Sequence, residues 1–173
     1  MYNTGVVRKI DELGRIVIPK EIRRNLGIKN GEEIEIYVEK DSIILKKNYR
    51  LFSLKEQVYE YLKLFNKYIF STICITDRDK IITFNKIDFS YLNNKKISTK
   101  LSNIIEQRKE DCGSNLNISE DKVISGNYYI KPIIVNTDLV GSIICISNEN
   151  ISEQEKFILE ILNALFKLKL ETD

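Results

Sequence analysis

The chain of 173 residues is 43% apolar and 30% charged, a composition typical of a globular protein with one or two domains. It contains no histidine, which excludes Ser-His-Asp and Cys-His hydrolysis, histidine-ligated zinc or haem, and phosphohistidine relays. No glycine-rich nucleotide-binding motif and no favourable pair of lysines or carboxylates occurs either, so we expect no catalytic residue, no cofactor and no metal.

The first elements are two short β-like runs and a short helix. Residues 5–10 form the first run, the turn signal Asp11-Glu12-Leu13-Gly14 follows, and residues 16–18 form the second run. Pro19 fixes φ in the first turn of the helix, and Gly27 can supply the left-handed residue that ends it. The turn and the helix are therefore expected to present their arginines together.

The net charge of +2 conceals one strongly cationic segment. Residues 1–30 carry seven lysines and arginines against three carboxylates, a local charge of +4. Residues 31–48 reverse the sign to −2, and the remainder is neutral. A concentrated excess of this kind is typical of a surface that binds polyphosphate.

A β-hairpin follows. Residues 33–39 alternate strictly, with Ile34, Ile36 and Val38 on one face, which predicts a half-buried strand. The turn at residues 40–42 leads into a second strand at residues 43–45. Because four short strands and one short helix cannot bury a sufficient core alone, we expect residues 1–50 to form a domain that dimerises.

Five cations are candidates for binding double-stranded DNA: Arg8, Lys9, Arg15, Arg23 and Arg24. Two copies would place ten cations about a two-fold axis, which a duplex backbone also has locally. Arginine can bind phosphate oxygens or a guanine edge in a bidentate way. Arginines near turns are usually solvated surface, but the clustering and the change of sign at Gly31 favour DNA contact. Lys9 is the weakest candidate, since alternation points it away from the strand face of Arg8.

Two stretches resemble a known family: TGVVRKIDELGRIVIPKEIRRNLGI, residues 4–28, and EEIEIYVEKDSIILKKN, residues 32–48. They are similar to the transition-state-regulator family of looped-hinge DNA-binding domains. The resemblance implies a swapped-hairpin β-barrel dimer, in which two chains exchange hairpins and contact DNA. The whole chain resembles the sporulation regulators of this family, which implies a transcriptional regulator acting late in sporulation, in the spore-forming compartment.

The pattern of residues 51–173 predicts a second domain that contains both helices and strands. The predicted fold class of the whole chain is therefore α+β. The patterns Ser53–Glu56 and Ser152–Glu155 are capping boxes that begin helices. The two helices carry apolar stripes at Leu54, Val58, Tyr61, Leu62, Phe65 and Ile69, and at Ile158, Ile161, Leu162, Leu165 and Leu168. Between them we expect β-rich runs at residues 69–76, 80–85, 128–135 and 139–147, a helix near residues 98–109 and a break at residues 113–115.

This order of elements resembles that of GAF-type sensor domains, in which helices flank an antiparallel sheet. Asn85, Lys86 and Phe89 match part of the pattern of cyclic-nucleotide-binding members, but the acidic pair of that pattern is missing. Two alternatives remain for the domain. It is either a sensor of an unidentified small-molecule ligand or an assembly module whose first and last helices pack against other copies. Resemblance to a tetrameric relative favours a homotetramer through these C-terminal helices.

The sequence shows no segment expected to span a membrane or direct secretion, which bears on the cellular compartment. No apolar stretch of 18 residues occurs and no basic start precedes an apolar run, so we expect a cytoplasmic, nucleoid-associated protein without membrane contact. Cys74, Cys112 and Cys145 are odd in number and widely spaced, which argues against a disulfide framework. Cys74 and Cys145 lie in strand-like runs and are expected to be buried apolar residues.

The function that fits these observations is that of a DNA-binding transcriptional regulator whose second domain multiplies binding sites by oligomerising or tunes them with a ligand. One alternative is an antitoxin that binds DNA with the same β-dimer and inhibits a partner toxin with a tail. Antitoxin tails are short, acidic and disordered until bound. Residues 53–173 are long, apolar and neutral, so the regulator is favoured.

Overall fold

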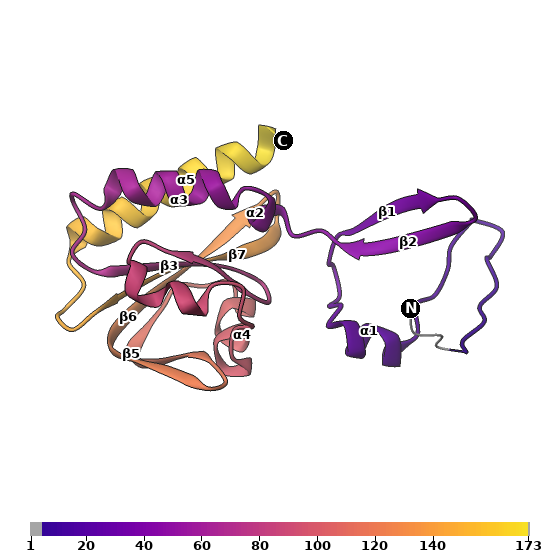
Figure 1. The fold of residues 1–173 in the computed structure, drawn as a ribbon, viewed down its shortest axis with the longest axis horizontal. Helices are drawn as coiled ribbons and strands as arrows, with labels where there is room; N and C mark the ends of the chain where they lie inside the picture. Colours follow the sequence, from indigo (N-terminus) through magenta and orange to yellow (C-terminus); the bar gives the residue numbers. More distant parts are fainter. Residues whose placement is uncertain (1–4, 173) are drawn as a thin grey trace. The chain divides into compact units, whose positions relative to one another are not determined.

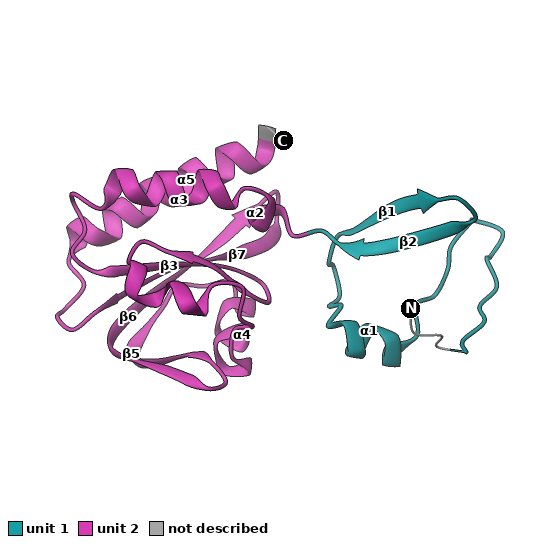
Figure 2. Ribbon diagram, in the orientation of Figure 1, with its two compact units in different colours: residues 1–48 teal, residues 49–173 magenta. Residues whose placement is uncertain are grey.

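A computed structural model describes residues 5–172 (Figure 1). The chain divides into two compact units, residues 1–48 and residues 49–173 (Figure 2). The division lies between Asn48 and Tyr49, whereas the sequence predicted a boundary between residues 50 and 51. Residues 1–4, which include the first residue of the motif that begins at Thr4, and residue 173 lie outside the described range.

The first unit consists of an irregular segment, residues 5–19, followed by one helix and one hairpin. Helix α1 (Lys20–Leu26) has Pro19 at its N-cap, one position earlier than predicted, and ends at Gly27 with a left-handed φ of 65°. Strands β1 (Ile34–Glu39) and β2 (Ser42–Lys47) pair in antiparallel register, with Val38 opposite Ile43. The helix and the hairpin are therefore confirmed.

The two β-like runs before α1 form no strand in this structure. The turn between them is present: the Gly14 amide donates to the Asp11 carbonyl at 2.9 Å, and the Asp11 amide donates to the Arg15 carbonyl at 3.1 Å. Residues 5–10 and 16–18, however, belong to no sheet, and β1 and β2 form a sheet of two strands. Since a strand needs a neighbouring strand for its backbone hydrogen bonds, these runs lack a partner strand within one chain.

The apolar side chains of the first unit lie at its surface. No residue from 5 to 48 is buried. The predicted half-buried face of β1 is wrong for a single chain, because Ile36 is 69% exposed and Val38 is 78% exposed. One copy of this unit therefore has no hydrophobic core of its own among the described residues.

The second unit is an antiparallel sheet between two helical layers, as predicted. Five strands are ordered β4-β3-β7-β6-β5. The helices are α2 (Arg50–Ser53), α3 (Lys55–Phe65), the 3₁₀ helix η1 (Ile87–Leu92), α4 (Thr99–Glu106) and α5 (Glu153–Thr172). The strands are β3 (Thr72–Asp77), β4 (Ile81–Phe84), β5 (Asp111–Ser119), β6 (Lys122–Val135) and β7 (Asp138–Ser147).

Each face of this sheet has its own core. Helices α3 and α5 cover one face, and η1 and α4 lie on the other (Figure 1). Cys145 belongs to the core under α3 and α5, and Cys74 to the core under η1 and α4. Both thiols are buried, which raises their pKa above the ordinary value. The prediction that these two cysteines are apolar core residues is confirmed.

One of the two predicted capping boxes is present. At the start of α5 the Ser152 amide donates to Glu155 Oε2 at 3.0 Å, and the Glu155 amide donates to Ser152 Oγ at 3.2 Å. The box at Ser53 is wrong, because Ser53 ends α2 and its hydroxyl donates to the Arg50 carbonyl at 2.7 Å. Helix α3 begins after Leu54 without a side-chain cap.

The predicted break at residues 113–115 is also wrong. These residues lie within β5, which pairs with β6 and shifts register between Ser114 and Leu116. Asn115 takes the left-handed conformation, with φ of 58°, at this irregularity. A β-bulge thus uses the turn residues without interrupting the strand.

Helix α5 packs on the sheet with a different face from the one that the sequence predicted. Leu159, Leu162, Phe166 and Leu170 face the core, and the Phe166 ring lies 6.1 Å from the ring of Tyr61 on α3. Of the predicted stripe only Leu162 is fully buried, and Leu168 is 61% exposed. The helix is apolar on more than one face, so periodicity alone could not select the face that packs on the sheet.

Candidate nucleic-acid interface

The turn before the second run holds Arg15 through one carboxylate. Asp11 Oδ1 accepts hydrogen bonds from the Leu13 amide at 3.0 Å and the Arg15 amide at 2.7 Å. Asp11 Oδ2 pairs with Arg15 Nε at 2.7 Å, and the Arg15 side chain is still 70% exposed. The hydrogen bonds from the Arg15 amide and guanidinium lower the pKa of Asp11. The turn therefore stays charged at neutral pH and presents the guanidinium to solvent.

The two arginines of α1 differ in how they are held. Arg23 is half-buried, and its Nη1 donates to Asn30 Oδ1 at 3.0 Å, which ties it to the segment after the helix. Its Nε is buried without a hydrogen-bond partner. Arg24 is exposed. One of the two side chains is thus fixed in place, and the other extends into solvent.

The remaining candidates, Arg8 and Lys9, lie on the segment before α1. Arg8 and Lys9 are exposed, and Arg8 Nη1 donates to the neighbouring Val7 carbonyl at 3.1 Å. The structure thus places Arg8, Lys9 and Arg15 on the segment before α1, and only Arg23 and Arg24 share an element. That all five meet on one surface of a dimer stays a prediction.

The structure also shows an ion pair that sequence reasoning missed. Lys47 Nζ lies 2.9 Å from Glu32 Oε1, and the two side chains are only 9% and 8% exposed. Lys47 Nζ also donates to the Gly27 carbonyl at 3.0 Å, and Glu32 Oε2 accepts from the Lys29 amide at 2.8 Å. The pair therefore fastens the C-terminal end of α1 to β2. No local sequence pattern marks a pair 15 residues apart.

In the second unit, the residues that partly match the cyclic-nucleotide pattern bond to the chain itself. Asn85 Oδ1 accepts from the Ile73 amide at 2.8 Å, and Lys86 Nζ donates to the Phe70 carbonyl at 2.7 Å. The Phe89 ring stacks on Phe84 at 5.3 Å between centroids. These contacts position η1 against the sheet.

Residues 5–172 contain neither a candidate metal-binding cluster nor a candidate membrane-spanning helix. Nowhere in residues 5–172 do three or more cysteine, aspartate or glutamate side chains gather in a way that could hold a metal ion. Within the same range, the helices are too short or too polar to span a membrane.

Two families match the chain, one for each unit. Residues 53–167 match the family described as stage V sporulation protein T C-terminal, transcription factor. Residues 7–50 match the family described as antidote-toxin recognition MazE, bacterial antitoxin.

Individual relatives from Bacillus subtilis strain 168 extend these matches. Stage V sporulation protein T is 35% identical over 157 residues, which cover 86% of each chain. The transition state regulatory protein AbrB is 62% identical over 47 residues, 27% of this chain and 49% of that protein. The solved N-terminal DNA recognition domain of Bacillus subtilis AbrB is 60% identical and covers 28% of this chain and 91% of that chain, with a TM-score of 0.25.

Proposed function

The chain belongs to the stage V sporulation protein T family, and from this membership we propose that it is a DNA-binding transcriptional regulator of sporulation. We place its action late in sporulation, in the spore-forming compartment, in the cytoplasm and at the nucleoid. The observation that carries the proposal is the sequence identity that spans 86% of both chains and includes both units. The family is described as a transcription factor, so no reaction is assigned to the chain.

The first unit is proposed to act as a homodimer. Its described residues include no buried apolar side chain, and groups such as Val17 and Val38 are largely exposed. A second copy could cover this apolar surface and provide strand partners for residues 5–10 and 16–18. This arrangement is the exchange of hairpins that the family resemblance implies.

DNA is proposed to lie across the two-fold axis of this dimer. Each copy contributes the guanidinium groups held by the turn and by α1, together with Arg8 and Lys9 from the segment before α1. Fixed guanidinium groups lose less conformational entropy when they bind phosphate or a base edge than freely moving ones. The exposed Arg15 side chain and the anchored Arg23 are therefore expected to contribute most.

Salt dependence tests this proposal directly. If the dimer neutralises some 6 to 10 phosphates, affinity for a promoter duplex should fall by about 10³ to 10⁵ between 50 and 200 mM salt. Fluorescence anisotropy with a labelled duplex, beside light scattering at the same concentrations, measures affinity and assembly together. A single-chain protein in dilute solution, or no duplex binding at low salt, would refute the proposal.

For the ion pair Glu32–Lys47 we predict a change in DNA affinity opposite in direction to the change that charge alone would cause. Replacing Glu32 by glutamine removes a negative charge, and charge alone would then strengthen binding to DNA. If the pair holds α1 in place, Glu32→Gln should instead weaken duplex binding by about tenfold, since charged hydrogen bonds are lost. Anisotropy at fixed salt distinguishes the two signs.

Lys46 provides the matched control for Lys47. Lys46→Met and Lys47→Met remove the same charge from neighbouring positions, but Lys46 Nζ lies over the Tyr37 ring and does not contact α1. We expect Lys47→Met to be clearly more damaging and Lys47→Arg to restore part of the affinity. Equal losses in the two methionine variants would show that Lys47 acts only through its charge.

The second unit is proposed to join dimers into a homotetramer. Leu64 on α3 and Phe157 and Leu168 on α5 are each more than 60% exposed, on the two helices that cover one face of the sheet. Exposed apolar groups on adjacent helices are typical of a helix-packing interface. The opposite face is filled by the core under η1 and α4, which favours assembly as the main role of this unit.

The antitoxin alternative draws on one finding, the family match of residues 7–50. That match covers the first unit alone. The second unit folds around two cores, whereas an antitoxin tail of the expected kind is short and acidic. Co-purification of a small partner protein with the full-length chain would support the alternative.

A further inference from the structure

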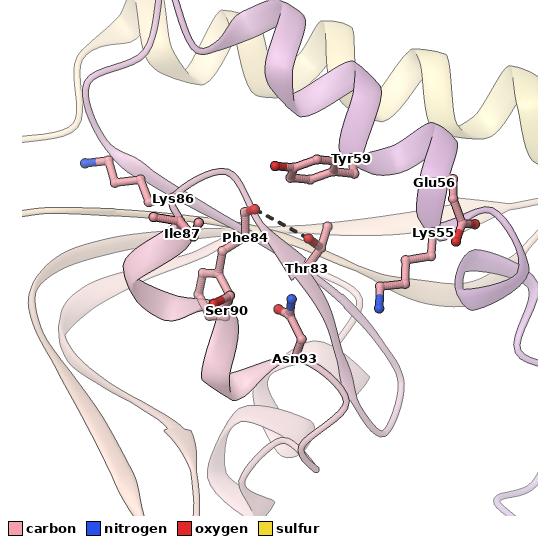
Figure 3. A pocket seen from close by; sticks show the side chains of 9 residues that line it. All are labelled: Lys55, Glu56, Tyr59, Thr83, Phe84, Lys86, Ile87, Ser90 and Asn93. Carbon is pink, nitrogen blue, oxygen red and sulfur yellow. Dashed lines mark hydrogen bonds between the residues drawn. The ribbon is translucent and has the colours of Figure 1, made fainter.

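A pocket of about 380 Å³ lies beside the edge strand β4, between α3 and η1 (Figure 3). Its apolar lining comes from Tyr59 on α3, Phe84 on β4 and Ile87 on η1. This volume is within the range of pockets that hold small molecules. Of its lining residues only Phe84 belongs to the core under η1 and α4, so a ligand could enter the pocket without unpacking the rest of that core.

Two polar groups in this pocket have unused hydrogen-bonding capacity. Thr83 is only 3% exposed, and its hydroxyl makes one long hydrogen bond, 3.4 Å, to the Phe84 carbonyl. Asn93 Oδ1 is buried without a hydrogen-bond partner. Figure 3 shows the Asn93 amide directed toward Thr83 at the base of the pocket. Buried polar groups are nearly always hydrogen-bonded, so these two are available to a ligand.

The charges at the pocket favour an anion. Lys55 and Lys86 line it at opposite ends, with the Lys86 ammonium group directed outward (Figure 3), and Glu56 is the single carboxylate in the lining. Lys86 Nζ donates to the Phe70 carbonyl, and Lys55 Nζ lies 5.8 Å from the Phe52 ring centroid. Within the described range neither lysine has a carboxylate partner. Neither ammonium group has a counter-charge among these residues, and Lys86 can pair with a ligand in the pocket by turning inward from the Phe70 carbonyl.

We propose that this pocket binds a small organic dicarboxylate with an apolar middle. One carboxylate pairs with Lys55 and the other with Lys86, while the apolar body lies against Tyr59 and Ile87. The Thr83 hydroxyl donates to the same ligand, and Asn93 donates through its amide NH2 group once the amide has turned over to bring that group to the position of Oδ1. The pairs are charge-assisted hydrogen bonds, which are stronger than neutral ones.

The site gives a physical route to regulation, and in this respect the inference rests on the proposed function. Lys55 and Tyr59 lie on α3, the helix that packs against α5 through Tyr61 and Phe166. A ligand that contacts α3 and η1 together would stabilise one position of α3. Because α3 and α5 are the proposed assembly helices, ligand binding would change the tetramer-dimer equilibrium.

Terephthalate, a rigid dicarboxylate, and its neutral diamide are suitable probes for calorimetry and amide chemical-shift mapping on the full-length protein. We expect terephthalate to bind and to shift signals from α3 and η1, and the diamide to bind about tenfold or more weakly, because it cannot form charged pairs. Equal affinities for the two probes, or no binding of terephthalate at millimolar concentration, would overturn the proposal.

Variants test the residues. The double variant Lys55→Met, Lys86→Met should weaken terephthalate binding by about tenfold or more, and the control Lys100→Met, Lys109→Met, with the same charge change on exposed lysines outside the pocket, should not. Ser90→Phe should abolish binding by filling the pocket while both lysines remain. Equal loss in the control, or full affinity in Ser90→Phe, would place the ligand elsewhere. A failure of the proposed function is distinguishable, since it would appear as lost duplex binding in dicarboxylate-free buffer.

Discussion

Arg15→Ala and Arg23→Ala are each expected to weaken duplex binding by about a hundredfold or more, because a symmetric dimer loses the charged hydrogen bonds of two copies at once. Arg15 presents an exposed guanidinium from a turn that Asp11 closes, and Arg23 is tied to Asn30. Both side chains are therefore positioned before DNA arrives, so little of the lost affinity could be recovered by neighbouring side chains.

The control for these variants is Lys20→Ala. Lys20 is an exposed cation on the same helix, outside the predicted contact set. Lys20→Ala should lower the affinity for DNA only slightly, by the general electrostatic attraction that any nearby cation provides. Light scattering should show that all three variants assemble as the unchanged protein does. Retained affinity in Arg15→Ala or Arg23→Ala, or an equal loss in Lys20→Ala, would show that the contact surface lies elsewhere.

The local elements could be predicted because each depends on residues close together in sequence. Gly27 ends α1 in the left-handed conformation, and the Ser152–Glu155 capping box begins α5. The β6–β7 hairpin joins the runs predicted at residues 128–135 and 139–147, and its turn has positive φ at Asn136 and Thr137. In each case the side chain or the missing Cβ sets the local backbone directly.

The predictions that failed depend on contacts between distant residues. The bulge at Asn115 exists because β5 pairs with β6, which no local turn signal could reveal. The packing face of α5 was selected by contacts such as Phe166 with Tyr61, more than 100 residues away. The strands expected at residues 5–10 and 16–18 need neighbours that a single chain does not supply.

The same division applies to the candidate site. The sequence identified the arginines by their clustering, but it could not identify how they are held. Asp11 stands out in the sequence only as part of a turn signal, and no pattern distinguishes Glu32 and Lys47 within the acidic stretch of residues 31–48. The structure shows that these groups hold the turn and the end of α1. Contact residues are thus visible in a charge pattern, whereas the residues that position them require the fold.

The exposed residues of α5 lead to the second large effect. Phe157 and Leu168 are 64% and 61% exposed on the helix whose opposite side packs on the sheet. The double variant Phe157→Lys, Leu168→Lys should convert a tetramer into a dimer, since two charges cannot be desolvated in an apolar helix interface. Light scattering measures this change directly.

Loss of the tetramer should appear in DNA binding only where sites are paired. Linking two dimers makes the second binding event intramolecular, so affinity for a duplex with two sites should fall by about 10² to 10⁴ in the double variant, while affinity for a single site is unchanged. Gln154→Lys, Gln107→Lys adds the same charge at exposed polar positions and should leave both affinities unaltered. An unchanged isotherm on paired sites, with the dimer confirmed, would show that the second unit regulates by another route.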